Sequence, residues 1–376
     1  MNVPSLTGVR GIAALWVVLF HIQSFAPELG IRPLQNLPVA RTGWAGVDLF
    51  FILSGFILML VHERDFPRLS LPPLLRFGWL RFFRVYPLAT AVLLLILLLT
   101  LIDREFGTFW NSRGVPTNFT ISSFLRTLFL ATRWWFPTDG DWNQPVWSLS
   151  VEILGYVAFP FIAVIATRLR NPWVLAILAT LCLAFPTLYA FLTHQKLFND
   201  DLFWGAPTRM AGGFTAGIVL ARLHRVTPES LRGLQGTVAD VALLAVIVAT
   251  LLPPYGWSTI TLCFGALVYG LASDRGLANR LLSTPVAVWL GRISFPLYLV
   301  HVMALAWLRY GLYRDNAGDA ERLLALGLYA VFILCLAWLL HLYVERPTHR
   351  FARDAFPAPG KARGAEAALA QSPANG

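Results

Sequence analysis

GVRGIAALWVVLFHIQSF, residues 8–25, is an apolar stretch that carries only two ionisable side chains, Arg10 and His21. Their spacing of eleven residues is close to three turns of a helix, so both side chains project from nearly one face. The rise between them is about 16 Å, or half of the hydrocarbon thickness of a bilayer. If Arg10 marks a membrane surface, His21 lies inside the membrane, where ionisable groups by default mark a pathway or a reaction site. A histidine satisfied by a neighbouring carbonyl is the alternative.

The rest of the chain is equally apolar. Of its 376 residues, 57% are hydrophobic and only 13% are charged. Because a soluble protein of this length could not bury so much apolar surface, we predict an all-α, multi-pass protein of the inner (plasma) membrane. The first helix lacks a basic leader and a small-residue cleavage site, so we expect it to be retained. The three cysteines lie in apolar segments without zinc spacing, and we expect no metal site.

About ten segments are candidates for transmembrane helices, and the sixth and seventh are the weakest because they are short or interrupted by glycine and polar residues. The candidate spans are residues 8–25, 43–62, 82–102, 146–167, 172–191, 205–222, 237–252, 255–273, 287–309 and 322–344. Lysine and arginine are more frequent in the loops on the side of the N-terminus, which predicts that both termini are cytosolic.

The predicted domain organisation is simple. Residues 1–352 form one membrane domain, and residues 353–376, rich in Ala, Gly and Pro, form a disordered cytosolic tail. Residues 121–135 have the apolar spacing and the tryptophan pair of an interfacial helix, which either forms a lid or simply packs against the domain. The net charge of +10 comes mostly from arginines beside the helices, and it favours anionic ligands over nucleic acid.

Arginines gather at the predicted cytosolic ends of the odd-numbered spans. Arg10 opens the first span, Arg81 and Arg84 open the third, and Arg292 opens the ninth. Arg81 and Arg84 lie one helical turn apart, and such a pair of guanidinium groups near a helix N-terminus suits a phosphate. Simple positive-inside anchoring is the alternative for these residues.

Acidic and histidine side chains within the spans fall in the opposite half of the membrane. They are His21, Asp48, Glu152 and His301, and Ser148 lies one turn before Glu152 on the same face. This pattern predicts a through-membrane site that an anionic ligand enters from the cytosol. A neutral histidine supported by a carboxylate is the usual arrangement of a general base, which could deprotonate a hydroxyl that attacks an activated acyl group. The spacing does not identify the carboxylate that supports His21.

Six segments occur in a specific order. They are LTGVRGIAALWVVLFH (6–21), GVDLFFILSGFIL (46–58), RFFRVYPL (81–88), VWSLSVEILGYVAFP (146–160), GRISFPLYLVH (291–301) and VERP (344–347). Together they resemble the acyltransferase family 3 membrane proteins, multi-span enzymes that move acyl groups onto hydroxyls, often of surface sugars. The resemblance runs through most of the membrane region. Some members carry an additional extracytoplasmic domain. This chain resembles the stand-alone form of the family.

The resemblance implies a role for each matching residue. His21 would be the catalytic base or a transiently acylated nucleophile, with Asp48 and Glu152 as essential acidic supports. The donor, a cytosolic acyl-coenzyme A, would be held by arginines. These donor-binding residues would be Arg10, Arg81 and Arg84, and the lesser members of the site would be Trp147, Ser148, Arg292 and His301.

The resulting hypothesis is O-acyl transfer, with acetyl as the first candidate, from acetyl-coenzyme A to a sugar hydroxyl of an exopolysaccharide, O-antigen or related lipid-linked glycan. A macrolide, a lipid or a signalling oligosaccharide is an alternative acceptor. A sugar or anion transporter is the alternative from a different class, since intramembrane charges would serve it as well. The absence of a convincing internal repeat argues against the transporter. The acceptor, the acyl chain length and the oligomeric state do not follow from the sequence.

Overall fold

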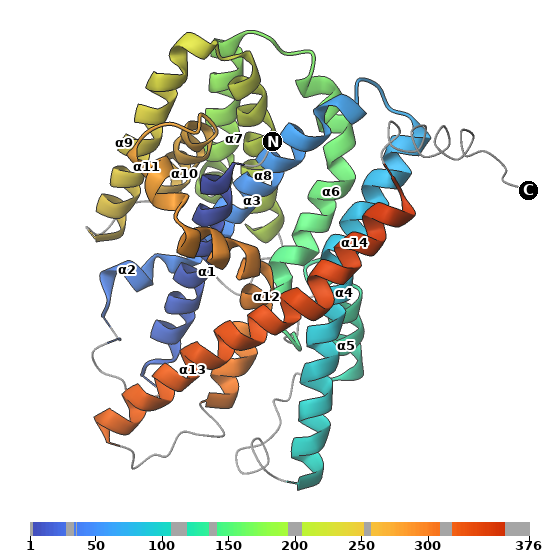
Figure 1. Ribbon diagram of the computed structural model, residues 1–376, viewed down its shortest axis with the longest axis vertical. Helices are drawn as coiled ribbons and strands as arrows, with labels where there is room; N and C mark the ends of the chain where they lie inside the picture. The colour runs from blue at the N-terminus through green and yellow to red at the C-terminus, as the bar shows by residue number, and fades with distance from the viewer. Residues whose placement is uncertain are drawn as a thin grey trace, which may run out of the picture.

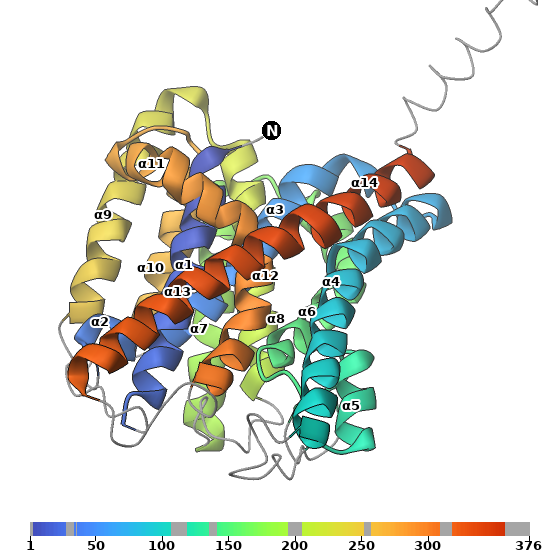
Figure 2. The ribbon, with the colours of Figure 1, turned by 60° about the horizontal axis from the view of Figure 1, so that its bottom comes forward.

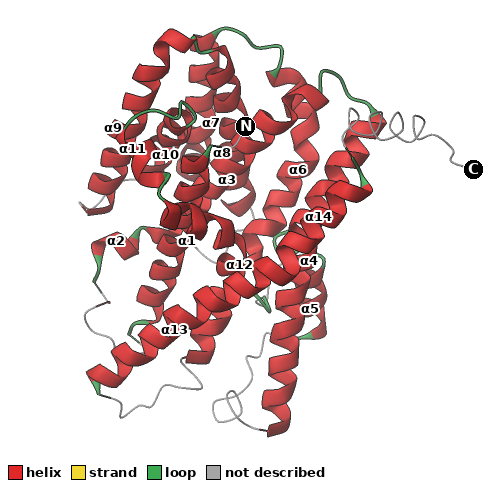
Figure 3. Ribbon diagram, in the orientation of Figure 1, coloured by secondary structure: helices red, strands yellow, loops and turns green. Residues whose placement is uncertain are grey.

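A helix forms at each of the ten predicted spans in the computed structural model, which describes residues 3–27, 34, 36–106, 119–134, 141–194, 205–251, 257–308 and 318–357 (Figure 1). Every regular element in these residues is helical (Figure 3). The ten helices are α1 (Pro4–Phe25), α3 (Gly46–His62), α4 (Leu71–Phe106), α6 (Val146–Ala166), α7 (Pro172–Thr193), α8 (Gly205–Val226), α9 (Arg232–Leu251), α10 (Trp257–Leu271), α12 (Pro285–Trp307) and α13 (Asp319–Leu340).

The all-α membrane fold is therefore confirmed, although length and composition alone support eight of the ten spans within the described residues. The two exceptions are α8, which contains Arg209, Arg222 and Arg225, and α10, which has 15 residues. Both helices are packed within the bundle: α8 contacts α3 and α7, and α10 contacts α9. Helices shielded by neighbours tolerate polar residues and short length better than helices that face lipid.

Local sequence signals fix several helix ends. Proline occupies the first turn of α1, α7 and α12, where its missing N–H costs nothing. Asn171 caps α7, because its side-chain oxygen accepts hydrogen bonds from the backbone N–H groups of Trp173 (2.9 Å) and Val174 (3.3 Å). The three short helices α2 (Pro38–Arg41), α5 (Ile121–Leu128) and α11 (Leu277–Leu282) lie between the long ones.

Two long helices cross beside the main bundle. One is α4, with 36 residues, and the other consists of α13, a π-helical turn at His341–Glu345, and α14 (Arg346–Ala355). Figures 1 and 2 show the ribbon of α13 and α14 running across α12 toward α4, which it contacts. The ordered helix therefore passes residue 353, where we predicted that the disordered tail begins. The remainder of that predicted tail, 358–376, lies outside the described residues.

The predicted interfacial helix is shorter than expected. Within 121–135, α5 ends at Leu128, and Trp135 lies outside the described residues. Trp134 donates its indole N–H to the backbone carbonyl of Ser150 on α6 at 2.8 Å. The hydroxyl of Tyr86 on α4 donates to the carbonyl of Phe129 at 3.1 Å. These contacts support the alternative that this segment packs against the domain.

Glycines allow the central helices to approach backbone to backbone, as small residues do in membrane bundles. A Cβ atom on Gly8 would lie 1.8 Å from the carbonyl oxygen of Leu282, and one on Gly291 would lie 1.9 Å from that of Thr7. These glycines bring α1 against α11 and α12. Because Arg10 is on α1, this packing also fixes the position of its side chain relative to α12.

We therefore expect Gly291→Leu to destabilise the protein by at least the usual cost of overpacking, about 1–3 kcal/mol. Neither the leucine side chain nor the facing backbone of Thr7 can move away without separating α1 from α12. The midpoint of thermal unfolding in detergent measures the effect. Gly327→Leu is the matched control, because a Cβ at Gly327 on α13 meets no atom within 4 Å. Equal midpoints for the two variants would contradict this packing.

Candidate active site

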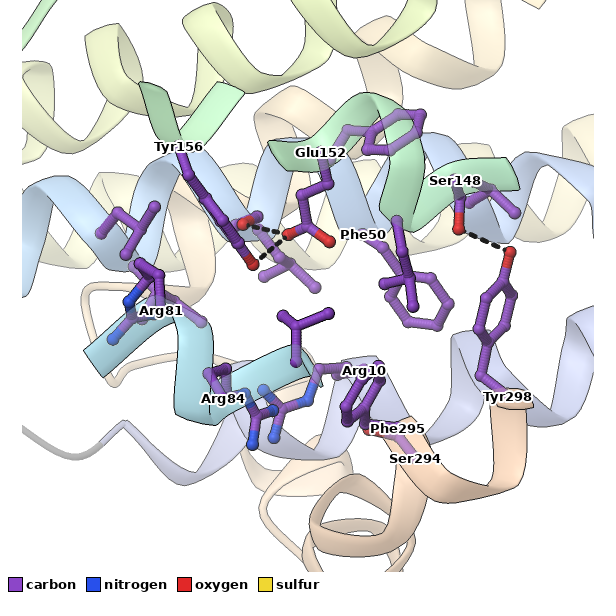
Figure 4. A pocket seen from close by; sticks show the side chains of 18 of the residues that line it. Arg10, Phe50, Arg81, Arg84, Ser148, Glu152, Tyr156, Ser294, Phe295 and Tyr298 are labelled. Atoms are coloured by element: carbon purple, nitrogen blue, oxygen red, sulfur yellow. Dashed lines mark hydrogen bonds between the residues drawn. The ribbon is translucent and has the colours of Figure 1, made fainter. Parts of the chain in front are cut away.

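A cavity of about 360 Å³ lies between α1, α3, α4, α6, α12 and α14 (Figure 4). Apolar side chains make up part of its lining, and the rest is polar. The polar residues that line it are Arg10, Ser54, Arg81, Arg84, Ser148, Glu152, Tyr156, Ser294, Tyr298 and His349. Five of the predicted site residues, from three separate motifs, therefore meet around one cavity: Arg10, Arg81, Arg84, Ser148 and Glu152.

Positive charge dominates this lining. Arg10 donates to the carbonyl of Gly291 at 3.0 Å, but its buried Nε has no hydrogen-bond partner among the described residues, and the same holds for the buried Nε of Arg81. Arg84 forms an ion pair with Glu345, and its Nη1 lies 3.4 Å from Nε2 of His349. Two carboxylates, Glu345 and Glu152, stand against three guanidinium groups, so the cavity keeps an excess of positive charge and is suited to attract an anion.

Glu152 supplies the carboxylate in the cavity lining. Its Oε1 accepts hydrogen bonds from the hydroxyls of Ser54 at 2.6 Å and Tyr156 at 2.9 Å. Figure 4 shows this carboxylate across the cavity from Arg10 and Arg84. Two hydroxyl donors to one oxygen fix the orientation of the carboxylate, which therefore presents a defined negative charge inside a mainly positive cavity.

Ser148 and Tyr298 connect the cavity with its histidine neighbours. Ser148 donates its only hydroxyl hydrogen to the carbonyl of Pro145 at 3.1 Å, so the 2.8 Å contact between the two hydroxyls has Tyr298 as the donor. One turn further along α12, the ring of His301 lies 5.7 Å from the ring of Tyr298. The ring of His21 lies 4.9 Å from that of His301.

The histidine pair has a defined arrangement of protons. Nδ1 of His21 lies 2.9 Å from the carbonyl of Val17, and Nδ1 of His301 lies 2.7 Å from that of Tyr298. Since a carbonyl oxygen only accepts, both Nδ1 atoms carry the proton in the neutral rings. The single Nδ1 proton of His21 is therefore shared: it is donated to the carbonyl of Val17 at 2.9 Å and, over the longer distance of 3.3 Å, to Nε2 of His301. Nε2 of His21 then has no hydrogen-bond partner among the described residues, and its lone pair is in the state that a general base requires.

We expected a carboxylate to support His21, but the described structure places a backbone carbonyl and a second histidine there. The described hydrogen bonds of His21 go to Val17 and His301. Asp48 instead forms two hydrogen bonds with Arg209, at 2.9 and 2.8 Å, and the side chains are only 2% and 4% exposed. Both residues are on helices that pack tightly together, α3 and α8, so the ion pair joins these helices.

The remaining predicted site residues lie outside the cavity lining. Ring contacts connect His21 to His301 and His301 to Tyr298, which lines the cavity. The ring of Trp147 lies 5.3 Å from the guanidinium carbon of Arg209, so it covers the buried ion pair. Arg292 is exposed, because the preceding Gly291 packs against α1 and one further residue turns the side chain by about 100°. Its location does not support the predicted role in the site.

Sequence reasoning did not identify several residues of this region. Tyr156 and Tyr298 lie in the segments 146–160 and 291–301, but tyrosine is a common residue in membrane proteins and did not stand out. Arg209 lies in a polar helix in which we recognised no motif. Glu345 belongs to the VERP segment, yet its pairing with Arg84 joins positions far apart in the sequence. Its carboxylate also accepts from His341 at 2.7 Å. Both residues lie in the π-helical turn, and such turns are frequent at functional sites. The turn is visible in the structure but has no recognisable pattern in the sequence.

The fold and the cavity together define a membrane-embedded helical protein with an anion-attracting interior site beside a histidine pair. A family model described as "Acyltransferase domain" matches residues 3–342. The chain belongs to this acyltransferase family, and it is a membrane acyltransferase. The predicted resemblance is confirmed. Within the described residues, no group of three or more His, Cys, Asp or Glu side chains could hold a metal ion.

Two curated relatives illustrate the similarity. Acyltransferase MdmB of Streptomyces mycarofaciens is 32% identical over 386 aligned positions, which cover 93% of this chain and 92% of that protein. Peptidoglycan O-acetyltransferase OatA of Listeria monocytogenes is 23% identical over 325 positions, which cover 80% of this chain but only 49% of that protein. The chain thus spans about half the length of OatA. No solved structure matches this chain significantly.

Proposed function

We propose that this protein transfers an acetyl group from acetyl-coenzyme A to a hydroxyl of a sugar in an exported or lipid-linked glycan. The observation that supports this most directly is the cavity lined by Arg10, Arg81 and Arg84, which adjoins the histidine pair through Tyr298. A phosphate-bearing thioester suits a cavity with guanidinium donors and a histidine base beside it. The relative OatA carries the name of an O-acetyltransferase.

In this proposal the donor enters with its phosphates against the arginines. Nε2 of His21 removes the proton from the acceptor hydroxyl while the hydroxyl oxygen attacks the carbonyl carbon of the thioester. The new ester C–O bond forms, the C–S bond breaks, and the proton held by His21 passes to the departing thiolate. The carbonyl of Val17 and Nε2 of His301 hold the Nδ1 proton of His21 and thereby the reactive tautomer. Attack by His21 itself, through an acyl-histidine, is the second route.

The acceptor side of the proposal rests on Glu152 and the Ser148–Tyr298 pair. Carboxylates and hydroxyls are suitable partners for sugar hydroxyls, because they accept and donate hydrogen bonds in a fixed geometry. These groups line the same cavity as the arginines. Macrolides, lipids and signalling oligosaccharides also carry hydroxyls and remain alternative acceptors. The predicted cytosolic entry of the donor remains part of the proposal.

We expect Arg10→Gln to raise the KM for acetyl-coenzyme A by about tenfold to a hundredfold, the range for loss of one hydrogen bond to a charged group. The variant removes a cation whose only described hydrogen bond is to Gly291, so the fold should survive. Initial rates at varied donor concentration measure the change. Arg292→Gln is the control, since this exposed arginine lies outside the cavity lining. Equal KM values for wild type and Arg10→Gln would remove Arg10 from the donor site.

A sugar or anion transporter is distinguished from an acyltransferase by the products. The acyltransferase releases coenzyme A in the same amount as acylated acceptor, and a transporter moves its solute without breaking a thioester. Purified protein in liposomes, supplied with acetyl-coenzyme A on one side, separates these outcomes. Uptake of labelled solute without free thiol would support the transporter.

A further inference from the structure

Helix α14 leads away from the candidate active-site cavity along α4. His349 of α14 lines the cavity, and its Nε2 lies 3.4 Å from Nη1 of Arg84. Further along α14, the carbonyl of Ala352 accepts the indole N–H of Trp79 at 3.1 Å (Figure 1). Trp79 precedes Arg84 in α4, and we predict that this helix begins in the cytosol. The helix α14 therefore extends from the cavity arginines toward the predicted cytosolic side.

All three arginines of α14, Arg346, Arg350 and Arg353, are exposed. Arg346 lies three residues before His349 and Arg353 lies four residues after it, so both are within about 60° of His349 around the helix axis. Nε of Arg353 also donates to the backbone carbonyl of His349 at 3.2 Å, which directs this side chain back toward the cavity residue. Arg350 is rotated by about 100° from His349 and lies further from the cavity.

Arg346 and Arg353, hereafter called the α14 arginine pair, carry uncompensated charge. Neither forms a salt bridge within the part of the chain that the structure describes. The carboxylate next to Arg346 in the sequence, Glu345, is already bound to Arg84 and His341. Exposed guanidinium groups without a carboxylate partner are suited to bind a phosphate.

Coenzyme A carries a phosphate that corresponds to this position. Its 3′-phosphate is on the ribose of the adenine nucleotide, and the pyrophosphate separates this nucleotide from the pantetheine arm and the thioester. In the proposed function, the pyrophosphate lies against Arg10, Arg81 and Arg84, and the thioester points toward His21. The nucleotide then lies on the opposite, cytosolic side of the cavity arginines, which is the side toward which α14 extends.

We propose that the α14 arginine pair binds the 3′-phosphate of the coenzyme A donor. This inference rests on the proposed function and adds to it the element that recognises the nucleotide. The arginines of the cavity bind the pyrophosphate, and α14 distinguishes coenzyme A from thioester carriers that lack the 3′-phosphate. Binding of anionic lipid is the other common role of exposed arginines at a membrane surface, and it does not depend on this phosphate.

Calorimetric titration of the purified protein in detergent tests the proposal without any turnover. The two ligands are coenzyme A and 3′-dephospho-coenzyme A, and we expect wild type to bind coenzyme A about tenfold more tightly. The double variant Arg346→Gln with Arg353→Gln should lose this preference, because its affinity for coenzyme A falls while its affinity for the dephospho form is retained. Arg280→Gln, at an exposed arginine of α11 outside the cavity lining, should keep the wild-type preference.

The outcomes separate this inference from the proposed function. Equal dissociation constants of the two ligands for wild type would overturn the 3′-phosphate site and leave coenzyme A as the donor. A preference that survives in the double variant would also overturn it, and is the result expected if the α14 arginine pair only contacts lipid. Failure of folded wild-type protein to bind either ligand would contradict the proposed donor itself, and this inference with it.

Discussion

His21→Ala is expected to lower the rate of acyl transfer by about 10²–10⁴-fold, the usual contribution of a positioned general base. The expected loss is large because Nε2 of His21 carries the free lone pair while Nδ1 is engaged by Val17 and His301. Alanine removes the base and leaves the arginine cavity intact, since His21 does not line it. The KM for acetyl-coenzyme A should therefore change much less than kcat. Steady-state kinetics on equal amounts of folded protein measure both constants.

Two further histidine variants sharpen this test. His301→Ala should lower kcat by less than His21→Ala, because His301 only positions its neighbour through the contact at 3.3 Å. His224→Ala is the matched control: this buried histidine of α8 is hydrogen-bonded to Gln235 and lies outside the cavity lining. Retention of wild-type kcat in His21→Ala would remove His21 from the chemistry. Equal losses in all three variants would indicate a structural effect.

Arg209→Met is expected to destabilise the protein by about 3–5 kcal/mol, the cost of leaving one partner of a buried ion pair uncompensated. The bidentate pair of Arg209 and Asp48 is almost fully buried, between the rings of Trp44 and Trp147. The midpoint of thermal unfolding in detergent should fall strongly. A double variant, Asp48→Leu with Arg209→Met, should recover most of the lost stability, because no buried charge remains.

The same double variant decides between two roles of Asp48. The family resemblance implies that Asp48 supports catalysis, whereas its ion pair with Arg209 between α3 and α8 indicates that it holds these two helices together. If the packing role is correct, the recovered double variant has substantial activity per folded molecule. A stable double variant without any transfer activity would restore Asp48 to the catalytic site.

The helices and half of the site could be predicted because both depend on local patterns. Apolar runs and their flanking residues determine where helices form. Arg10 lies three helical turns before His21, and Arg81 lies one turn before Arg84, so the sequence places all three arginines at the start of a span and on a defined helix face. Their convergence on one cavity was expected from the assigned membrane half of each span. The orientation relative to the cytosol stays a prediction.

Pairings between helices could not be predicted in this way. The sequence shows that Asp48, Glu152 and His21 are unusual inside apolar segments, but not which side chains they meet. Asp48 forms its ion pair with Arg209, and Arg84 forms its ion pair with Glu345. His301 lies beside His21, where we expected a carboxylate. Each pairing depends on how far two helices are rotated about their axes. Close glycine contacts, such as that of Gly291 with Thr7, determine this rotation.

The most direct test of the central claim is a stoichiometric assay with acetyl-coenzyme A labelled in its acetyl group. Purified wild-type protein in liposomes receives the donor and a fraction of envelope glycan, and free thiol and labelled glycan are measured together. The account predicts one coenzyme A released for each acetyl group that appears on the glycan, and neither product with His21→Ala. No thiol release by folded wild-type protein across a varied pool of acceptors would contradict it.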